Sequence, residues 1–118
     1  GIDFAGNGFQ NSWESTNALD YGDSTFYPTP ADYDGDGKAD ISAKGENGFW
    51  GIDYAANGFM GWEVEKDNVG DSSFVPIPAD YDGDGMADLA VFVLNNVVGI
   101  DYAADGFSDT WDDEFQLQ

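Results

Sequence analysis

The amino-acid sequence predicts an all-β fold built from tandem four-stranded antiparallel repeats of the β-propeller type. Three observations support this prediction: segments recur every 48 to 50 residues or so, apolar residues alternate with period two, and turn residues separate the segments. The segment GIDFAGNGF begins at Gly1, GIDYAANGF at Gly51 and GIDYAADGF at Gly99, and a tryptophan follows each copy. We therefore expect a single repeat domain of about two and a half blade-like units, incomplete as a monomer. The domain is residues 1–118, with units at about 1–50, 51–98 and a partial unit at 99–118.

Each unit is expected to contain four short strands. One carries the GID motif, because Trp50, Ile52 and Tyr54 alternate with smaller or polar residues, as in a half-buried strand. A second should carry the tryptophan, in residues 61–66. The third contains the prolines of PTPA or PIPA, which lack an amide donor and so favour a sheet edge. The fourth starts inside an aspartate-rich loop and runs ADISAK or ADLAVFV. Four short strands per unit of this length are typical of a propeller blade, and no segment predicts a helix.

Charge and composition exclude several classes of function. The chain has 24 Asp and Glu residues against three lysines, with no Arg and no His, giving a formal net charge of -21. Nucleic acid is therefore an unsuitable partner, because binding it requires a cationic surface. The absence of Cys and His removes disulfides, thiol catalysis and the usual zinc ligands. No apolar run approaches the roughly 18 residues of a membrane span, so we expect no membrane insertion.

Two copies of one aspartate loop are the strongest signal in the sequence. DYDGDGKAD begins at Asp32 and DYDGDGMAD begins at Asp80. Carboxylates at loop positions 1, 3, 5 and 9, with glycines that let the chain curl, can converge with the position 7 carbonyl on a hard cation. Ca²⁺ suits this flexible all-oxygen geometry better than Mg²⁺, so we expect two calcium sites. The expected ligands are Asp32, Asp34, Asp36, the Lys38 carbonyl and Asp40 in the first loop, and Asp80, Asp82, Asp84, the Met86 carbonyl and Asp88 in the second.

The spacing of these acids differs from that of an EF-hand. An EF-hand needs a glutamate at position 12 and flanking helices, but position 12 is Ala43 in the first loop and Val91 in the second. The ninth-position aspartates, Asp40 and Asp88, are expected to close the sites instead. Two carboxylates about 5 Å apart repel by roughly 3 kcal/mol at an effective dielectric of about 20. We therefore expect metal binding and folding to be linked.

The loops and the strands after them resemble a known family. PADYDGDGKADISAK and PADYDGDGMADLAVF are similar to the calcium-binding FG-GAP or VCBS-type repeats of extracellular, mainly bacterial, β-propellers. The FG and GAP motifs that name the family are not clearly present. The resemblance implies structural calcium, an extracellular location and a structural or adhesive role without catalysis.

The recurring aromatic residues leave two interpretations open. Trp13, Trp62 and Trp111 occupy the same place in each unit, so they pack one blade against the next or stack on a glycan. Tyr33 and Tyr81, inside the loops, are expected to cover the calcium sites. The Asp and Glu pairs of WESTN and WDDE carry no sign of a catalytic pKa shift, so we expect no enzyme activity; a role as accessory domain of a secreted hydrolase is the weakest alternative.

The incomplete repeat also bears on partners. A monomer would expose unpaired sheet edges and uncovered blade faces. We therefore expect self-association or contact with flanking repeats of the same protein, as a ring or a fibre. A carbohydrate-binding module of the lectin type is the alternative.

Overall fold

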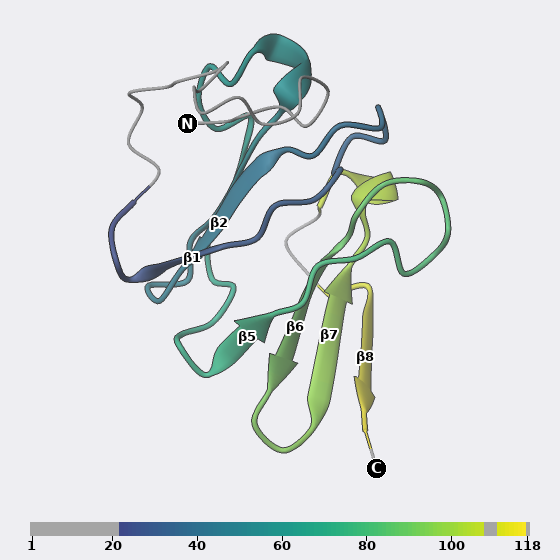
Figure 1. The fold of residues 1–118 in the computed structure, drawn as a ribbon. Coiled ribbons are helices and arrows are strands. Elements are labelled where there is room, and N and C mark those ends of the chain that lie inside the picture. The colour runs from purple at the N-terminus through teal and green to yellow at the C-terminus, as the bar shows by residue number, and fades with distance from the viewer. Residues whose placement is uncertain (1–21, 108–110, 118) are drawn as a thin grey trace, which may run out of the picture.

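The computed structural model describes residues 22–107 and 111–117, which form an all-β structure (Figure 1). Two four-stranded antiparallel sheets follow one another along the chain, with strand orders β1-β2-β3-β4 and β5-β6-β7-β8. The strands of the first sheet are β1 (Phe26–Pro28), β2 (Ile41–Gly45), β3 (Trp50–Asp53) and β4 (Val64–Lys66). Those of the second sheet are β5 (Phe74–Pro76), β6 (Leu89–Val93), β7 (Val97–Asp101) and β8 (Asp113–Gln116). The all-β prediction is confirmed, and in the described ranges helix is limited to the 3₁₀ turns η2 (Ala55–Asn57) and η3 (Ala103–Asp105).

Each sheet is a meander in which every strand pairs with its sequence neighbour. The proline-containing strands β1 and β5 lie at sheet edges, as the sequence predicted, because Pro28 and Pro76 have no amide to donate to a further strand. The aspartate loops connect β1 to β2 and β5 to β6. An isolated bridge joins the two ends of each loop, Ala31 with Asp40 and Ala79 with Asp88. Both loops therefore leave a sheet and return to it at neighbouring positions.

The strand that follows the GID motif starts later than predicted. Residues 61–66 were expected to be one strand, but β4 begins only at Val64. Gly61 has a φ of 120°, outside the range of a strand, and its amide donates to Asp53 Oδ2 over 3.0 Å. Trp62 therefore lies just before the strand, where the chain is still turning.

The sheets do not follow the unit boundaries chosen from the sequence. The boundary at 50/51 falls inside β3, and the boundary at 98/99 falls inside β7. Each sheet takes its proline strand and loop strand from one sequence unit and its GID and tryptophan strands from the next. The described residues thus form two complete sheets, neither of which closes on itself. The copy of the GID segment that starts at Gly1 lies outside the described residues.

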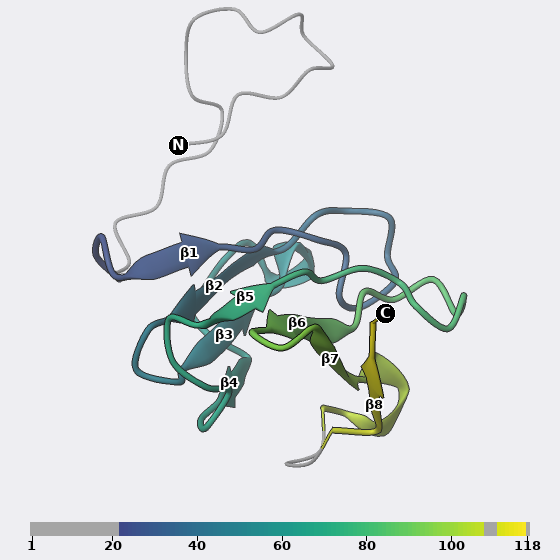
Figure 2. The same ribbon diagram turned by 90° about the horizontal axis from the view of Figure 1, so that it is seen from below.

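The main core lies between the two sheets, where a face of the first sheet packs against a face of the second (Figure 2). Side chains alternate between the two faces of a strand, so Trp50 and Ile52 lie on one face of the first sheet and Leu89 and Val91 on one face of the second. These four residues are fully buried in one apolar cluster. Burying each aliphatic side chain contributes about 1.5 to 3 kcal/mol, so this contact stabilises the packing of the two sheets.

Polar contacts also connect the two sheets. Lys44 is buried, and its Nζ donates to the Asp71 carbonyl over 3.1 Å. Lys66 Nζ lies 2.5 Å from Asp101 Oδ2, and both side chains are buried. Because each lysine belongs to the first sheet and its partner lies in or before the second, these contacts fix how the sheets sit on one another.

Candidate metal centres

Asp32 organises the first aspartate loop. Its Oδ1 accepts a hydrogen bond from the Gly35 amide (2.7 Å) and its Oδ2 accepts one from the Gly37 amide (2.8 Å). Both glycines have positive φ, 80° and 86°, a conformation that carries little cost only for residues without a Cβ. The glycines of the motif thus let the backbone wrap around the first carboxylate.

The next two aspartates continue the same curl. Asp34 Oδ1 accepts from the Asp36 amide over 3.2 Å, and Asp36 Oδ1 accepts from the Lys38 amide over 2.8 Å. One carboxylate oxygen from each of Asp32, Asp34 and Asp36 lies within 4.8 Å of the others, a spacing that a metal ion could bridge. Three of the four predicted acids of this loop are therefore together.

Asp40 is buried and has a different set of partners. Its Oδ2 accepts from the Tyr33 amide over 2.8 Å, and its Oδ1 accepts from the Ala55 amide over 2.9 Å. The ninth-position carboxylate therefore ties the start of its own loop to turn η2. Hydrogen bonds of amides to a carboxylate contribute about 1.5 to 3 kcal/mol each.

The second loop repeats this geometry. Asp80 accepts from the amides of Gly83 (2.8 Å) and Gly85 (2.9 Å), and Asp88 accepts from Tyr81 (2.8 Å) and Ala103 (2.9 Å). The acids grouped within 4.8 Å here are Asp80, Asp82 and Asp88. Asp84 lies outside this group, and its Oδ1 accepts from the Met86 amide over 2.9 Å.

The charges of the acids in these loops act on one another. Burial raises the pKa of Asp34 above its usual value, and the charges of Asp40 and Asp36 add to the effect. The pKa of Asp82 is raised in the same way, by burial and then by the charges of Asp88 and Asp84. Without a cation, ionisation of Asp34 and of Asp82 is therefore less favourable than usual, and a cation bound in the loop would oppose this effect.

The tyrosines of the loops do not share one environment. Tyr33 is buried between the sheets, where its ring meets Phe107 edge to face with centroids 6.3 Å apart. Burial raises its pKa to about 12. Tyr81 occupies the same place in the second loop but is exposed. The Tyr33 ring therefore belongs to the core, and the expectation that the two rings cover the metal sites stays a prediction.

Sequence reasoning missed a third acidic group, formed by Asp101, Asp105 and Asp112. Asp101 ends β7 in the buried ion pair with Lys66. Burial raises its pKa to about 6 against the opposing effect of Lys66, and Asp105 and Asp112 add to the rise. The signal was available, because an aspartate follows the isoleucine in every GID copy. The lysine already supplies a cation to this group.

Two of the recurring tryptophans lie over the GID glycines. A Cβ on Gly51 would stand 2.6 Å from the Trp62 ring, and one on Gly99 would stand 3.1 Å from the Trp111 ring. Trp111 is half-buried against the core between the sheets. Trp13 lies outside the described residues.

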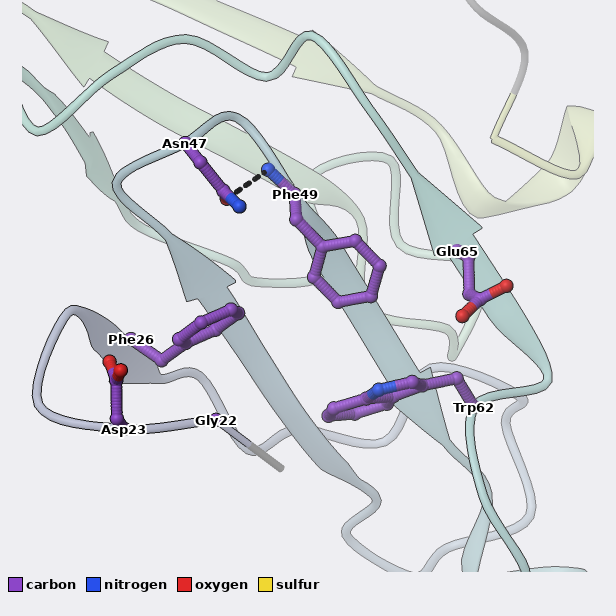
Figure 3. Close-up of a pocket in the computed structure, with 7 residues that line it drawn as sticks. All are labelled: Gly22, Asp23, Phe26, Asn47, Phe49, Trp62 and Glu65. Atoms are coloured by element: carbon purple, nitrogen blue, oxygen red, sulfur yellow. Dashed lines mark hydrogen bonds between the residues drawn. The ribbon is translucent and has the colours of Figure 1, made fainter. Parts of the chain in front are cut away.

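Trp62 lines a pocket of about 440 Å³ on the face of the first sheet opposite to the face that carries Trp50 and Ile52 (Figure 3). Its ring meets Phe49 edge to face with centroids 5.8 Å apart, and the ring of Phe26 faces the same space. The side chains of Asp23, Asn47 and Glu65 supply polar groups around the pocket. Packing therefore accounts for Trp111, whereas the pocket keeps both interpretations open for Trp62.

Together the fold and the loops define an all-β protein with two antiparallel sheets and one acidic loop before the second strand of each. Comparisons with protein-family models, with curated proteins and with solved structures found no match. The resemblance to FG-GAP or VCBS-type repeats therefore stays a prediction. In the part of the chain that the structure describes, no helix has the length and apolar character of a membrane span.

Proposed function

We propose that this chain is an extracellular, calcium-stabilised β-repeat module with a structural, assembly or adhesive role. The observation that carries the proposal is the duplicated loop geometry. In both loops the first aspartate accepts two glycine amides, and the ninth ties the loop to the 3₁₀ turn after the third strand of its sheet. The same arrangement in both loops favours a common ligand over chance clustering of acids.

The chemistry of the loops favours calcium. Every candidate donor is an oxygen atom, and the chain has no His or Cys to offer a softer metal. The glycine-rich loops have room to adjust, which suits the six to eight flexible ligands of Ca²⁺ better than the strict octahedron of Mg²⁺. In this proposal the ion neutralises a loop whose acids otherwise oppose one another's ionisation.

The antiparallel meander of each sheet is compatible with a propeller blade, so the resemblance to calcium-binding propeller repeats extends the proposal to the whole molecule. In this view calcium holds the loop of each blade in shape, and the blades have a structural role in a larger assembly. Self-association into a ring or fibre, or contact with flanking repeats, would complete the architecture.

A thermal melt tests the proposal. Calcium at about 100 times its Kd stabilises a protein by about 2.7 kcal/mol per site, so millimolar calcium should raise Tm by several degrees relative to EGTA. The double variant Asp32→Asn/Asp80→Asn should lose the shift, whereas Asp67→Asn, at an exposed position outside both loops, should keep it. An equal Tm in calcium and EGTA for the unmodified chain would refute the proposal.

The pocket in Figure 3 favours a second candidate function, carbohydrate binding. A half-buried indole beside carboxylate and amide groups combines an apolar platform with hydrogen-bonding side chains, as sugar recognition requires. On this view Trp62→Ala abolishes signal on a glycan array, whereas Tyr27→Ala, an exposed aromatic residue outside the pocket, leaves it unchanged. The absence of any glycan signal from the folded, calcium-loaded chain would exclude this alternative.

A further inference from the structure

The two sheets of one chain pack front to back. We call front the face of each sheet that carries the side chains of Ser42, Lys44, Trp50 and Ile52, or of their repeat equivalents Ala90, Phe92, Val98 and Ile100. The opposite face, which carries Ile41 or its equivalent Leu89, is the back. The front of the first sheet covers the back of the second, since Trp50 and Ile52 share one buried cluster with Leu89. Within the described residues, the front of the second sheet faces no further sheet.

The side chain of Tyr33 inserts into the second sheet at this contact, and we call it the knob. Tyr33 is only 1% exposed and is packed with Ala87 and Leu89, just before and at the start of β6, and with Phe107, which follows β7. Next to it, the Ala87 amide donates to the Asp32 carbonyl over 2.7 Å, which joins the two aspartate loops directly. The buried tyrosine ring and the hydrogen bond between the loops therefore hold the two sheets together at the same place.

The same knob is present, and exposed, on the second unit. Tyr81 OH donates to the Ile77 carbonyl over 2.6 Å, as Tyr33 OH donates to the Thr29 carbonyl over 2.7 Å. The two side chains thus have the same hydrogen bond, but Tyr81 is 42% exposed. Its ring is held in the same position as that of Tyr33, and among the described residues no second socket receives it.

The matching socket lies on the back of the first sheet. The residues equivalent to Ala87, Leu89, Ala103 and Phe107 are Ala39, Ile41, Ala55 and Phe59, which line a cavity of about 700 Å³. Ala39 is exposed and Ile41 half-buried, whereas Ala87 and Leu89 are buried under the first sheet. The described part of the chain therefore carries an exposed knob on the second sheet and, on the first sheet, a socket of the same design that no other described strand covers.

The uncovered front face is also more apolar than the one it repeats. Phe92 occupies the place of Lys44, and Phe115 pairs with Val98 as Lys66 pairs with Trp50. Phe115 and Val75 are exposed on this face. Phenylalanine rings thus replace the two lysines that connect the first sheet to the second. An exposed apolar face of this kind favours burial against another sheet.

We propose that a second copy of this chain docks head to tail, with Tyr81 of one copy in the Ala39, Ile41 and Ala55 socket of the next. The Ala39 amide of the second copy then meets the Asp80 carbonyl of the first, as Ala87 meets Asp32 within one chain. The inference deepens the assembly role proposed above and rests on it, with the partner now defined as the same chain. Such a contact uses two different surfaces, so it propagates until a ring closes or a fibre grows.

Sedimentation of the full chain in calcium and about 150 mM salt tests this contact, since salt screens the repulsion between strongly acidic copies. The unmodified chain should gain mass with concentration. Tyr81→Ser, which lacks the knob, and Ala39→Glu, which places a charge in the socket, should each stay monomeric. An equimolar mixture of the two variants should form dimers and nothing larger, because only one intact knob and one intact socket remain per pair.

Tyr27→Ser is the matched control, because Tyr27 is 48% exposed and lies outside the socket. It should associate like the unmodified chain. The proposal is overturned if the unmodified chain stays monomeric at every concentration, which would mean that another segment or partner covers the socket. It is also overturned if the mixture of the two variants stays monomeric. Thermal melts of the same samples with and without calcium distinguish failure of the docking contact from failure of the metal sites. If the chain stays monomeric but calcium still raises its Tm, the metal sites are supported and only the docking contact is refuted.

Discussion

At the scale of single residues, the ninth aspartate of each loop differs from the others. Asp40 and Asp88 are buried, and each accepts two amides from separate parts of the chain. Asp36 and Asp84 are exposed and each accepts one amide within the loop at 2.8 to 2.9 Å. The sequence predicted that the ninth aspartate closes the loop, but the contacts with Ala55 and Ala103 depend on the fold.

Asp40→Asn should therefore destabilise the chain even without metal. An amide group has one acceptor oxygen, so one of the two backbone donors loses its partner, at about 1 to 3 kcal/mol. Asp36→Asn, as control, keeps an oxygen for its single bond and should cost under about 1 kcal/mol. Urea unfolding in EGTA measures both; equal losses would contradict the role assigned to Asp40.

Asp101 gives the metal-free chain a defined dependence on pH. Burial raises its folded pKa from 3.8 to about 6, so the folded state holds this proton more tightly than the unfolded state. The resulting stabilisation is fully present below about pH 4 and is lost as the pH rises through about 6. The loss should be on the order of 3 kcal/mol.

Unfolding in EGTA from pH 4 to pH 7 measures this effect. Asp101→Asn, which cannot titrate, should flatten the pH dependence over that interval relative to the unmodified chain. A variant with the same slope as the unmodified chain would mean that other acids carry the dependence.

At the scale of elements, the positions of glycine determine how the tryptophans pack. The sequence predicted four short strands per unit, with the prolines on edge strands and an aspartate loop before one strand, and the described residues agree because these features depend on local patterns. The predicted strand at residues 61–66 was wrong at Trp62, because the hydrogen bond between Gly61 and Asp53 holds the chain in a turn before β4 begins. Sequence reasoning also missed the acidic group around Asp101, which forms only when β7 and β8 pair.

The two GID glycines provide a matched pair of variants. A Cβ at Gly51 would meet the Trp62 ring at 2.6 Å, whereas one at Gly99 would meet the Trp111 ring at 3.1 Å. Gly51→Ala should therefore destabilise the chain by about 1 to 3 kcal/mol and displace Trp62, with a smaller effect for Gly99→Ala. Denaturant melts followed by tryptophan fluorescence compare them, and the reverse order would contradict the packing described here.

At the scale of the whole molecule, the net charge of -21 works against the compact state. The apolar contact between the sheets and the pairs made by Lys44 and Lys66 oppose this repulsion. The front-to-back packing of the sheets could not be read from the sequence, because the repeat gives the number of units but not which faces meet. Calcium in the two loops would remove charge where the acids are most crowded.

Calorimetric titration of the metal-free chain with calcium measures whether the two aspartate loops bind the ion. We expect saturable binding of two calcium ions per chain, one for each aspartate loop, and of one ion after Asp80→Asn or Asp32→Asn. No saturable binding, or binding that both substitutions together leave unchanged, would contradict this expectation.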